Sequence, residues 1–222
     1  MDFMNENRPH SVLQSHDYLP AAGHDILLPA FDLLSRALGT PALHDRLVAQ
    51  AELRPGHRVI EIGCGTGNLV IKAIRAQPAA EVIGSDPDPK ALARAERKAK
   101  GLSGLRFERG YAQNLPHPDG EFDRVLSALM LHHLPTDIKA AALTEARRVL
   151  RPGGRLHLVD VGGDITRANT FLGRQLLRNG HVEANLALPH LLETAGFDHT
   201  LISSESHPRM GHIVYYQATR PA

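Results

Sequence analysis

The sequence predicts an α/β fold, a doubly wound and mostly parallel Rossmann-like sheet that ends in an antiparallel C-terminal edge hairpin. Two observations predict this fold. From residue 57 onward, short apolar runs alternate with longer helical patterns, as strands joined by crossover helices do. Near the C-terminus, only a short turn around Pro208 and Gly211 separates two strand-like runs, 199–207 and 212–220. Neighbouring strands with so short a link must pair antiparallel.

The parallel part is expected to contain five buried strands with helices between them. The strand runs are HRVIEI (57–62), AEVIGS (80–85), LRFERG (105–110), FDRVLS (122–127) and GRLHLVDV (154–161). The helical stretches are NLVIKAIRAQ (68–77), PKALARAERKAKG (89–101) and DIKAAALTEARRVLR (137–151), with a further helix near 190–197. Asp88 is placed to cap the second of these helices, and RPGG at 151–154 is expected to end the third.

Two more helices are predicted before the first strand, over residues 25–38 and 41–53. We therefore divide the chain into an N-terminal helical leader, residues 1–52, and a Rossmann-like domain, residues 53–222. Helices in this place can lie across the carboxyl edge of the sheet, so the leader is a candidate lid. Its Leu, Ile and Phe residues fit simple packing on the core equally well.

Composition narrows the classes of partner. The chain of 222 residues carries 25 Lys and Arg against 24 Asp and Glu, which gives no electrostatic reason to expect nucleic acid or an anionic membrane. No run is long and apolar enough to span a membrane, and the N-terminus has no signal pattern. Cys64 is the only cysteine, which excludes an internal disulfide and a multi-thiolate metal site. We expect a cytoplasmic protein, and its oligomeric state stays open.

The stretch VIEIGCGTGNL (59–69) has the clearest chemical content. Gly63, Gly65 and Gly67 follow the first strand, at the edge of the sheet where open parallel sheets bind ligands. Glycine permits a tight turn, a positive φ and close approach to the backbone, although turn chemistry alone would also explain it. Asp86 ends the second strand, where a carboxylate can accept both ribose hydroxyls of an adenosine group.

The kind of adenosine ligand follows from what surrounds the glycines. Their spacing is G-x-G-x-G, whereas dinucleotide enzymes use G-x-G-x-x-G and a Walker loop needs Lys followed by Ser or Thr. Glu61 would repel a pyrophosphate near the loop. The combination favours S-adenosylmethionine, which carries a sulfonium and an ammonium group and no phosphate.

Four segments in ordered succession resemble the class I S-adenosylmethionine-dependent methyltransferases. They are VIEIGCGTGNL, VIGSDPD, GYAQNLPHPDGEFDRVLSALMLHHL and EARRVLRPGGRLHLVD, and they cover about residues 57–161. Within that family, the chain is similar to the small-molecule branch that includes the ubiquinone and menaquinone biosynthesis methyltransferases. The resemblance implies methyl transfer from S-adenosylmethionine to a small-molecule acceptor.

The resemblance also implies roles for individual residues. The methionine and ribose parts would be surrounded by Gly63, Gly65, Thr66 and Gly67, in a loop that Glu61 would shape. Asp86 would hold the ribose hydroxyls, and the Ser127 carbonyl would meet the methionine ammonium. Pro87 would lie against the adenine, and Ala112 and Gln113 would contact the adenine edge. Tyr111 departs from the pattern, because the family has Asp or Asn there. The usual side-chain contact to the adenine amino group is therefore in doubt.

The catalytic residues are left open by the sequence. A general base is needed only where the acceptor is a weakly acidic hydroxyl or carbon acid, and the candidates are His132, His133, His24 and Tyr18. His132 and His133 are adjacent, so on a helix their side chains diverge by about 100° and cannot readily share a metal; no metal site is expected. Two other classes stay open, a non-catalytic adenosyl-ligand binding protein and, disfavoured by the glycine spacing, an NAD-dependent oxidoreductase.

Overall fold

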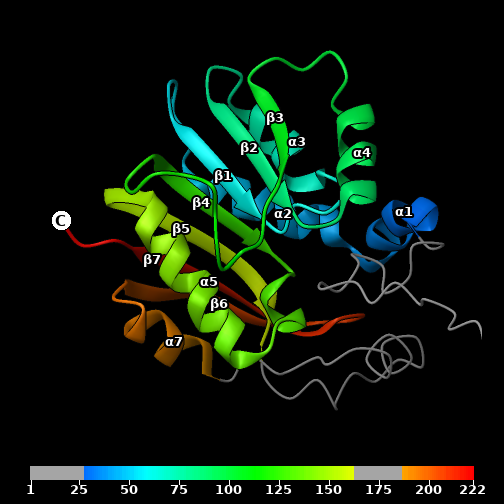
Figure 1. Cartoon of the computed structure of the whole chain (residues 1–222). Coiled ribbons are helices and arrows are strands. Elements are labelled where there is room, and N and C mark those ends of the chain that lie inside the picture. The colour runs from blue at the N-terminus through cyan, green and yellow to red at the C-terminus, as the bar shows by residue number, and fades with distance from the viewer. Residues whose placement is uncertain (1–27, 163–186) are drawn as a thin grey trace, which may run out of the picture.

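The computed structural model describes residues 28–162 and 187–222, and these residues contain one seven-stranded sheet of order β3-β2-β1-β4-β5-β7-β6 (Figure 1). The strands are β1 (Arg58–Ile62), β2 (Glu81–Asp86), β3 (Leu105–Arg109), β4 (Phe122–Ala128), β5 (Leu150–Val161), β6 (Asp198–His207) and β7 (Gly211–Thr219). The first five are parallel, while β7 pairs antiparallel with both β5 and β6. The predicted doubly wound sheet and its edge hairpin are confirmed.

Helices cover both faces of this sheet. They are α1 (Leu28–Leu38), α2 (Thr40–Ala51), α3 (Asn68–Ala76), α4 (Pro89–Lys98), α5 (Thr136–Val149) and α7 (Leu188–Thr194), with a 3₁₀ helix η2 (Leu131–His133) after β4. On one face α5 and α7 pack on Ile60 and neighbouring residues; on the other α2 and α3 pack on Val59. Successive residues of a strand point to opposite faces, so a strand covered on both sides is buried at consecutive positions, as β1 is over residues 59–62.

The two predicted N-terminal helices are present as α1 and α2. Of these, α2 buries Leu43, Leu47 and Ala51 in the same core cluster as β1 and α3. The cap of α4 is also as predicted, since the Asp88 carboxylate accepts the Lys90 N–H at 2.8 Å. Residues 1–27 lie outside the described residues, and with them Tyr18, His24 and the first part of the candidate lid.

One boundary prediction is wrong. The fifth strand was expected to begin at Gly154, after RPGG had ended the third helix, but β5 already begins at Leu150 and runs through residues 151–154. The cause is pairing with the C-terminal end of the chain. Gly153 donates its N–H to the Arg220 carbonyl at 2.9 Å, and Arg220 donates in turn to the Gly154 carbonyl at 2.9 Å. This partner lies too far along the sequence to be visible in the local pattern.

None of the helices within residues 28–162 and 187–222 combines the length and the apolar character that crossing a membrane requires.

Candidate cofactor and acceptor site

The predicted cofactor residues lie at or just beyond the carboxyl ends of β1, β2, β3 and β4. The chain runs outward from β1 to β3 and then returns to β4 on the other side of β1, so strand order reverses between β1 and β4. Ligands of open α/β sheets bind in the crevice that such a reversal creates. The loop of residues 63–67, here called the glycine loop, joins β1 to α3 at this point.

The glycine loop is built by hydrogen bonds from its own backbone N–H groups. Those of Gly63 and Cys64 both donate to the Ser85 carbonyl, at 2.9 and 3.0 Å, and that of Gly67 donates to the Cys64 carbonyl at 2.8 Å. The Gly65 N–H donates to Asp86 Oδ2 at 2.7 Å. Four donors that a phosphate-binding loop would offer to its ligand are therefore engaged within the protein.

All three glycines have positive φ angles, 72° at Gly63, 50° at Gly65 and 77° at Gly67. At two of them, the space that a side chain would fill is taken by the chain itself. A Cβ at Gly63 would lie 2.3 Å from Met130 Cγ, and one at Gly67 would lie 2.9 Å from both Ala95 and Phe107. At these two positions glycine therefore allows other side chains of the protein to pack closely against the backbone.

Asp86 lies at the end of β2 and is 7% exposed. Its second oxygen, Oδ1, accepts the Asp88 N–H at 2.9 Å. Burial raises the pKa of Asp86, and its two backbone N–H donors, Asp88 and Gly65, partly offset this. Each carboxylate oxygen can accept a further hydrogen bond, so the group can still receive ribose hydroxyls beside the glycine loop.

Glu61 is buried on β1, directly before the glycine loop, and stabilises the start of α3. Its Oε2 accepts the Val70 N–H at 3.1 Å, which ties β1 to the first turn of α3. Burial raises the pKa of Glu61 well above its ordinary value. Because burial favours the neutral form of this carboxyl, it weakens the repulsion of pyrophosphate that the sequence predicts for Glu61. The backbone contact is the physical basis of its role.

Pro87 and Tyr111, which lie beyond the carboxyl ends of β2 and β3, are joined by a residue that sequence reasoning missed. Arg109 donates from Nε to the Pro87 carbonyl at 3.1 Å and from Nη2 to the Tyr111 hydroxyl at 3.3 Å. In the strand register Arg109 at the end of β3 pairs with Asp86 at the end of β2, and the sequence showed it only as an arginine near the end of the third strand run. Of the two predicted adenine-edge residues that follow, Ala112 is half-buried and Gln113 is exposed.

Ser127 is buried near the end of β4, and its hydroxyl has no hydrogen-bond partner among the described residues. The side chain lines a small apolar pocket with Ile62, Leu131 and residues of α5. A ligand contact at this position would therefore come from the backbone, as the resemblance implies.

Beyond the end of β4, His132 is held by a carboxylate that sequence reasoning did not single out. Asp160 near the end of β5 lies with Oδ1 2.5 Å from His132 Nδ1, and its Oδ2 accepts the Leu131 N–H at 2.8 Å. Burial would raise the pKa of Asp160, but His132 and the Val161 N–H outweigh it and lower the pKa. An acid inside the apolar run LHLVDV was the available signal. His133 stacks obliquely on His132, with ring centroids 3.9 Å apart, and is exposed.

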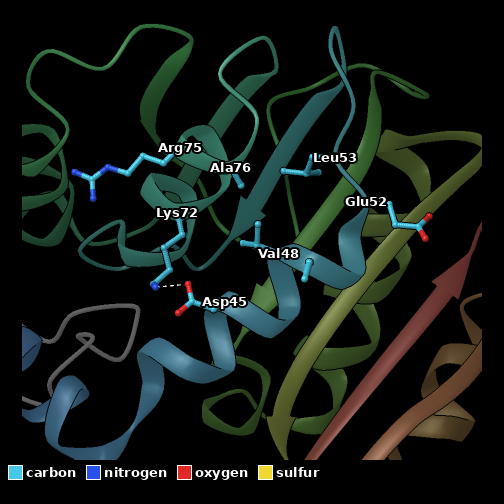
Figure 2. Close-up of a pocket in the computed structure, with 8 residues that line it drawn as sticks. Asp45, Val48, Glu52, Leu53, Lys72, Arg75 and Ala76 are labelled. Atoms are coloured by element: carbon cyan, nitrogen blue, oxygen red, sulfur yellow. Dashed lines mark hydrogen bonds and ion pairs between the residues drawn. The ribbon is translucent and has the colours of Figure 1, made fainter.

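The described residues contain no group of three or more His, Cys, Asp or Glu side chains that could hold a metal ion. A groove of about 600 Å³ lies elsewhere, between α2 and α3 (Figure 2). It is lined by Asp45, Val48, Ala49, Glu52, Leu53, Lys72, Arg75 and Ala76. None of the predicted site residues lines this groove, so it is separate from the candidate site.

Comparison with known proteins agrees with this geometry. Residues 59–154 match the family described as "Methyltransferase domain". The chain is 38% identical to a demethylmenaquinone methyltransferase of Deinococcus radiodurans, over 60% of this chain and 56% of that protein. It is 39% identical to a 27-O-demethylrifamycin SV methyltransferase of Amycolatopsis mediterranei, over 54% of this chain and 44% of that protein.

Among solved structures, a SAM-dependent methyltransferase from Aquifex aeolicus matches with a TM-score of 0.63 at 19% identity, covering 80% of this chain and 89% of the other. At that identity the likeness concerns the fold. The chain spans about half the length of the curated relatives that it matches. The family match, the relatives and the fold agree, and residues 59–154 of this chain are similar to the class I S-adenosylmethionine-dependent methyltransferases.

Proposed function

We propose that this protein transfers a methyl group from S-adenosylmethionine to a small-molecule acceptor. The observation that carries the proposal is the hydrogen bonding of the backbone N–H groups in the glycine loop. Its N–H groups at residues 63, 64, 65 and 67 are already bonded within the protein, and one of their acceptors is the Asp86 carboxylate. A pyrophosphate would need such donors free and would be repelled by a carboxylate there. An adenosyl ligand without phosphate needs neither condition.

The bound cofactor would supply an electrophilic methyl group on a sulfonium. We assign the ribose hydroxyls to Asp86, the adenine face to Pro87, the adenine edge to Ala112 and Gln113, and the methionine ammonium to the Ser127 carbonyl. Glu61, Gly63, Gly65, Thr66 and Gly67 would shape the wall around the methionine and ribose parts. Alignment and exclusion of water then provide much of the rate.

His132 is our choice for the general base. Asp160 accepts the Nδ1–H of His132, which places the ring's free lone pair on Nε2. This Nε2 has no hydrogen-bond partner among the described residues. It would take the proton of an acceptor hydroxyl or carbon acid, and the acceptor's electron pair would bond to the methyl carbon as the methyl–sulfur bond breaks and S-adenosylhomocysteine leaves. His133, exposed beside it, is the second candidate.

A small-molecule acceptor is supported by two relatives, whose names specify demethylmenaquinone and 27-O-demethylrifamycin SV. The near balance of 25 basic and 24 acidic residues supports an acceptor other than nucleic acid. The single cysteine, Cys64, is free and buried, which agrees with the cytoplasmic location that we expect. The leader as a lid stays a prediction, because residues 1–27 lie outside the described part of the chain.

The test is methyl transfer itself. The purified protein is incubated with methyl-labelled S-adenosylmethionine and a panel of phenols, hydroquinones, enols, amines and thiols, and labelled products are identified by mass spectrometry. Transfer to a small hydroxyl or carbon acid supports the proposal. Tight cofactor binding with no transfer to any acceptor would favour the non-catalytic binding protein instead.

A further inference from the structure

Helix α1 is attached to the glycine loop by one carboxylate. Asp32 accepts hydrogen bonds from Thr66 Oγ1 at 2.6 Å and from Asn68 Nδ2 at 3.0 Å. It also forms ion pairs with Arg94 Nε at 2.8 Å and Lys98 Nζ at 3.1 Å. Four donors from the loop, the start of α3 and helix α4 thus converge on a single side chain of α1.

The cluster is closed by Lys98. Besides Asp32, its ammonium donates to Thr66 Oγ1 at 3.1 Å and to Asn68 Oδ1 at 2.5 Å. The side chains of Asp32, Arg94 and Lys98 are all largely buried. Burial would raise the pKa of Asp32, but the bonds from Thr66, Arg94, Asn68 and Lys98 lower it to about 2. The carboxylate is therefore ionised throughout the physiological range.

Thr66 has a special place in this cluster, because it stands between Gly65 and Gly67 and is 1% exposed. Its hydroxyl donates to Asp32 and accepts from Lys98, so both the rotamer and the hydroxyl proton are fixed. The preceding residue, Gly65, donates its N–H to Asp86. Two consecutive loop residues are thus held by two carboxylates, Asp86 from β2 and Asp32 from α1.

We propose that Asp32 is a positioning residue of the cofactor site, holding Thr66 and with it the glycine loop in the conformation that receives the cofactor. The inference rests on the proposed function for the identity of the ligand. Without the carboxylate charge, Arg94 and Lys98 lose their shared partner, and Lys98 stays beside Thr66 with its charge uncompensated. The loop then has to be ordered by the ligand, which lowers affinity.

The alternative is that Asp32 only attaches α1 to the domain. Asp45 provides a matched control, since it forms an ion pair with Lys72 that joins the other N-terminal helix, α2, to α3 (Figure 2). That pair is part of the wall of the separate groove, and no residue of the glycine loop lines this groove. Asp45→Asn therefore removes one helix-attaching carboxylate without changing the glycine loop.

The experiment compares Asp32→Asn, Asp45→Asn and the full wild-type chain by calorimetric titration with S-adenosylhomocysteine, and by amide hydrogen exchange over residues 63–69. Asp32→Asn is expected to weaken binding about tenfold, within the range of coupling in one hydrogen-bond network, and to speed exchange in the loop. Asp45→Asn is expected to leave both unchanged. In a double mutant with Thr66→Val, Asp32→Asn should cause little further loss.

Unchanged affinity and loop exchange in Asp32→Asn would overturn the proposal, even if the melting temperature falls. If the wild type does not bind S-adenosylhomocysteine, the proposed function fails, and loop exchange alone then decides on Asp32. Should Asp32→Asn fail to fold, Asp32→Glu replaces it. Glu keeps the charge for Arg94 and Lys98 but moves the carboxylate relative to Thr66, so weaker binding supports positioning and wild-type binding contradicts it.

Discussion

Gly63 and Met130 lie so close together that a Cβ on Gly63 would be 2.3 Å from Met130 Cγ. Met130 follows Leu129, which has a φ of 54°, a strained value for a residue with a side chain. The Leu129 N–H donates to the Val159 carbonyl at 2.8 Å, and this bond to β5 helps to hold the strained turn. The turn after β4 therefore brings the Met130 side chain onto the glycine loop.

Gly63→Ala tests this contact. We expect it to cost about 1 kcal/mol for the left-handed backbone and a further 1–3 kcal/mol, roughly, for the clash with Met130. Gly56→Ala is the matched control, because Gly56 has a φ of 78° and no atom lies within 4 Å of the position that a Cβ would take there. Urea unfolding measures both variants. Equal losses of unfolding free energy in the two variants would show that the contact with Met130 adds no cost. Adding Met130→Ala should restore part of the stability lost in Gly63→Ala and none of that lost in Gly56→Ala.

His132→Gln should lower turnover by a factor of about 10²–10⁴, as expected for loss of a general base, with cofactor affinity unchanged. Asp160→Asn should lower turnover in the same direction, because the ring loses the acceptor that fixes its tautomer. Steady-state kinetics and calorimetric titration separate the two effects. If His133→Gln has the larger effect on turnover, the exposed ring is the base and our assignment of His132 is wrong.

Asp86→Ala should weaken S-adenosylmethionine binding by about 1.5–3 kcal/mol through loss of charge-assisted hydrogen bonds. The carboxylate also accepts the N–H groups of Gly65 and Asp88. A loss of unfolding free energy of about 1–3 kcal/mol is therefore expected as well. Asp119→Asn, which changes an exposed carboxylate paired with Arg148, is the control. If Asp86→Ala binds S-adenosylmethionine as tightly as the wild type, Asp86 does not hold the ribose hydroxyls.

Local patterns predicted most of this fold. Helix and strand boundaries agree within a few residues because apolar periodicity is a property of neighbouring positions. The predicted start of the fifth strand was wrong because RPGG pairs with Arg220, which is distant in sequence. The glycine loop was found for the same local reason, but the side chains of Met130 and Phe107 that fill its hollows come from other elements.

The two missed carboxylates, Asp32 and Asp160, act through tertiary contacts with the loop and with His132. A sequence shows such residues only as acids among apolar neighbours, in FDLLSRAL and LHLVDV. That signal marks a buried polar group without naming its partner, because the partner is determined by the packing of separate elements.

Acidification should destabilise the protein below about pH 6.5. Burial lowers the pKa of His44 to about 4 and that of His157 to about 3, from an ordinary value of 6.5. Below pH 6.5 the unfolded chain binds protons that the folded chain does not, so stability falls with pH until the folded pKa is reached. At pH 5 the loss should be on the order of 1–2 kcal/mol for each histidine.

Urea unfolding at pH 7.5 and pH 5 measures this loss, and His157→Leu should reduce it. Asp32 affects stability at a lower pH. Its pKa is lowered from 3.8 to about 2, so the ionised carboxylate's contribution to stability is lost only below about pH 4. Equal stability at the two pH values would contradict the neutral, buried state of these histidines.

The central claim is that the glycine loop receives an adenosyl ligand without phosphate. Calorimetric titration of the wild-type chain with S-adenosylmethionine, S-adenosylhomocysteine and NAD, under one set of conditions, tests it most directly. We predict that the two adenosyl ligands bind and that NAD binds much more weakly, because the loop N–H groups are engaged and Asp86 lies beside them. NAD binding more tightly than both adenosyl ligands would contradict the claim.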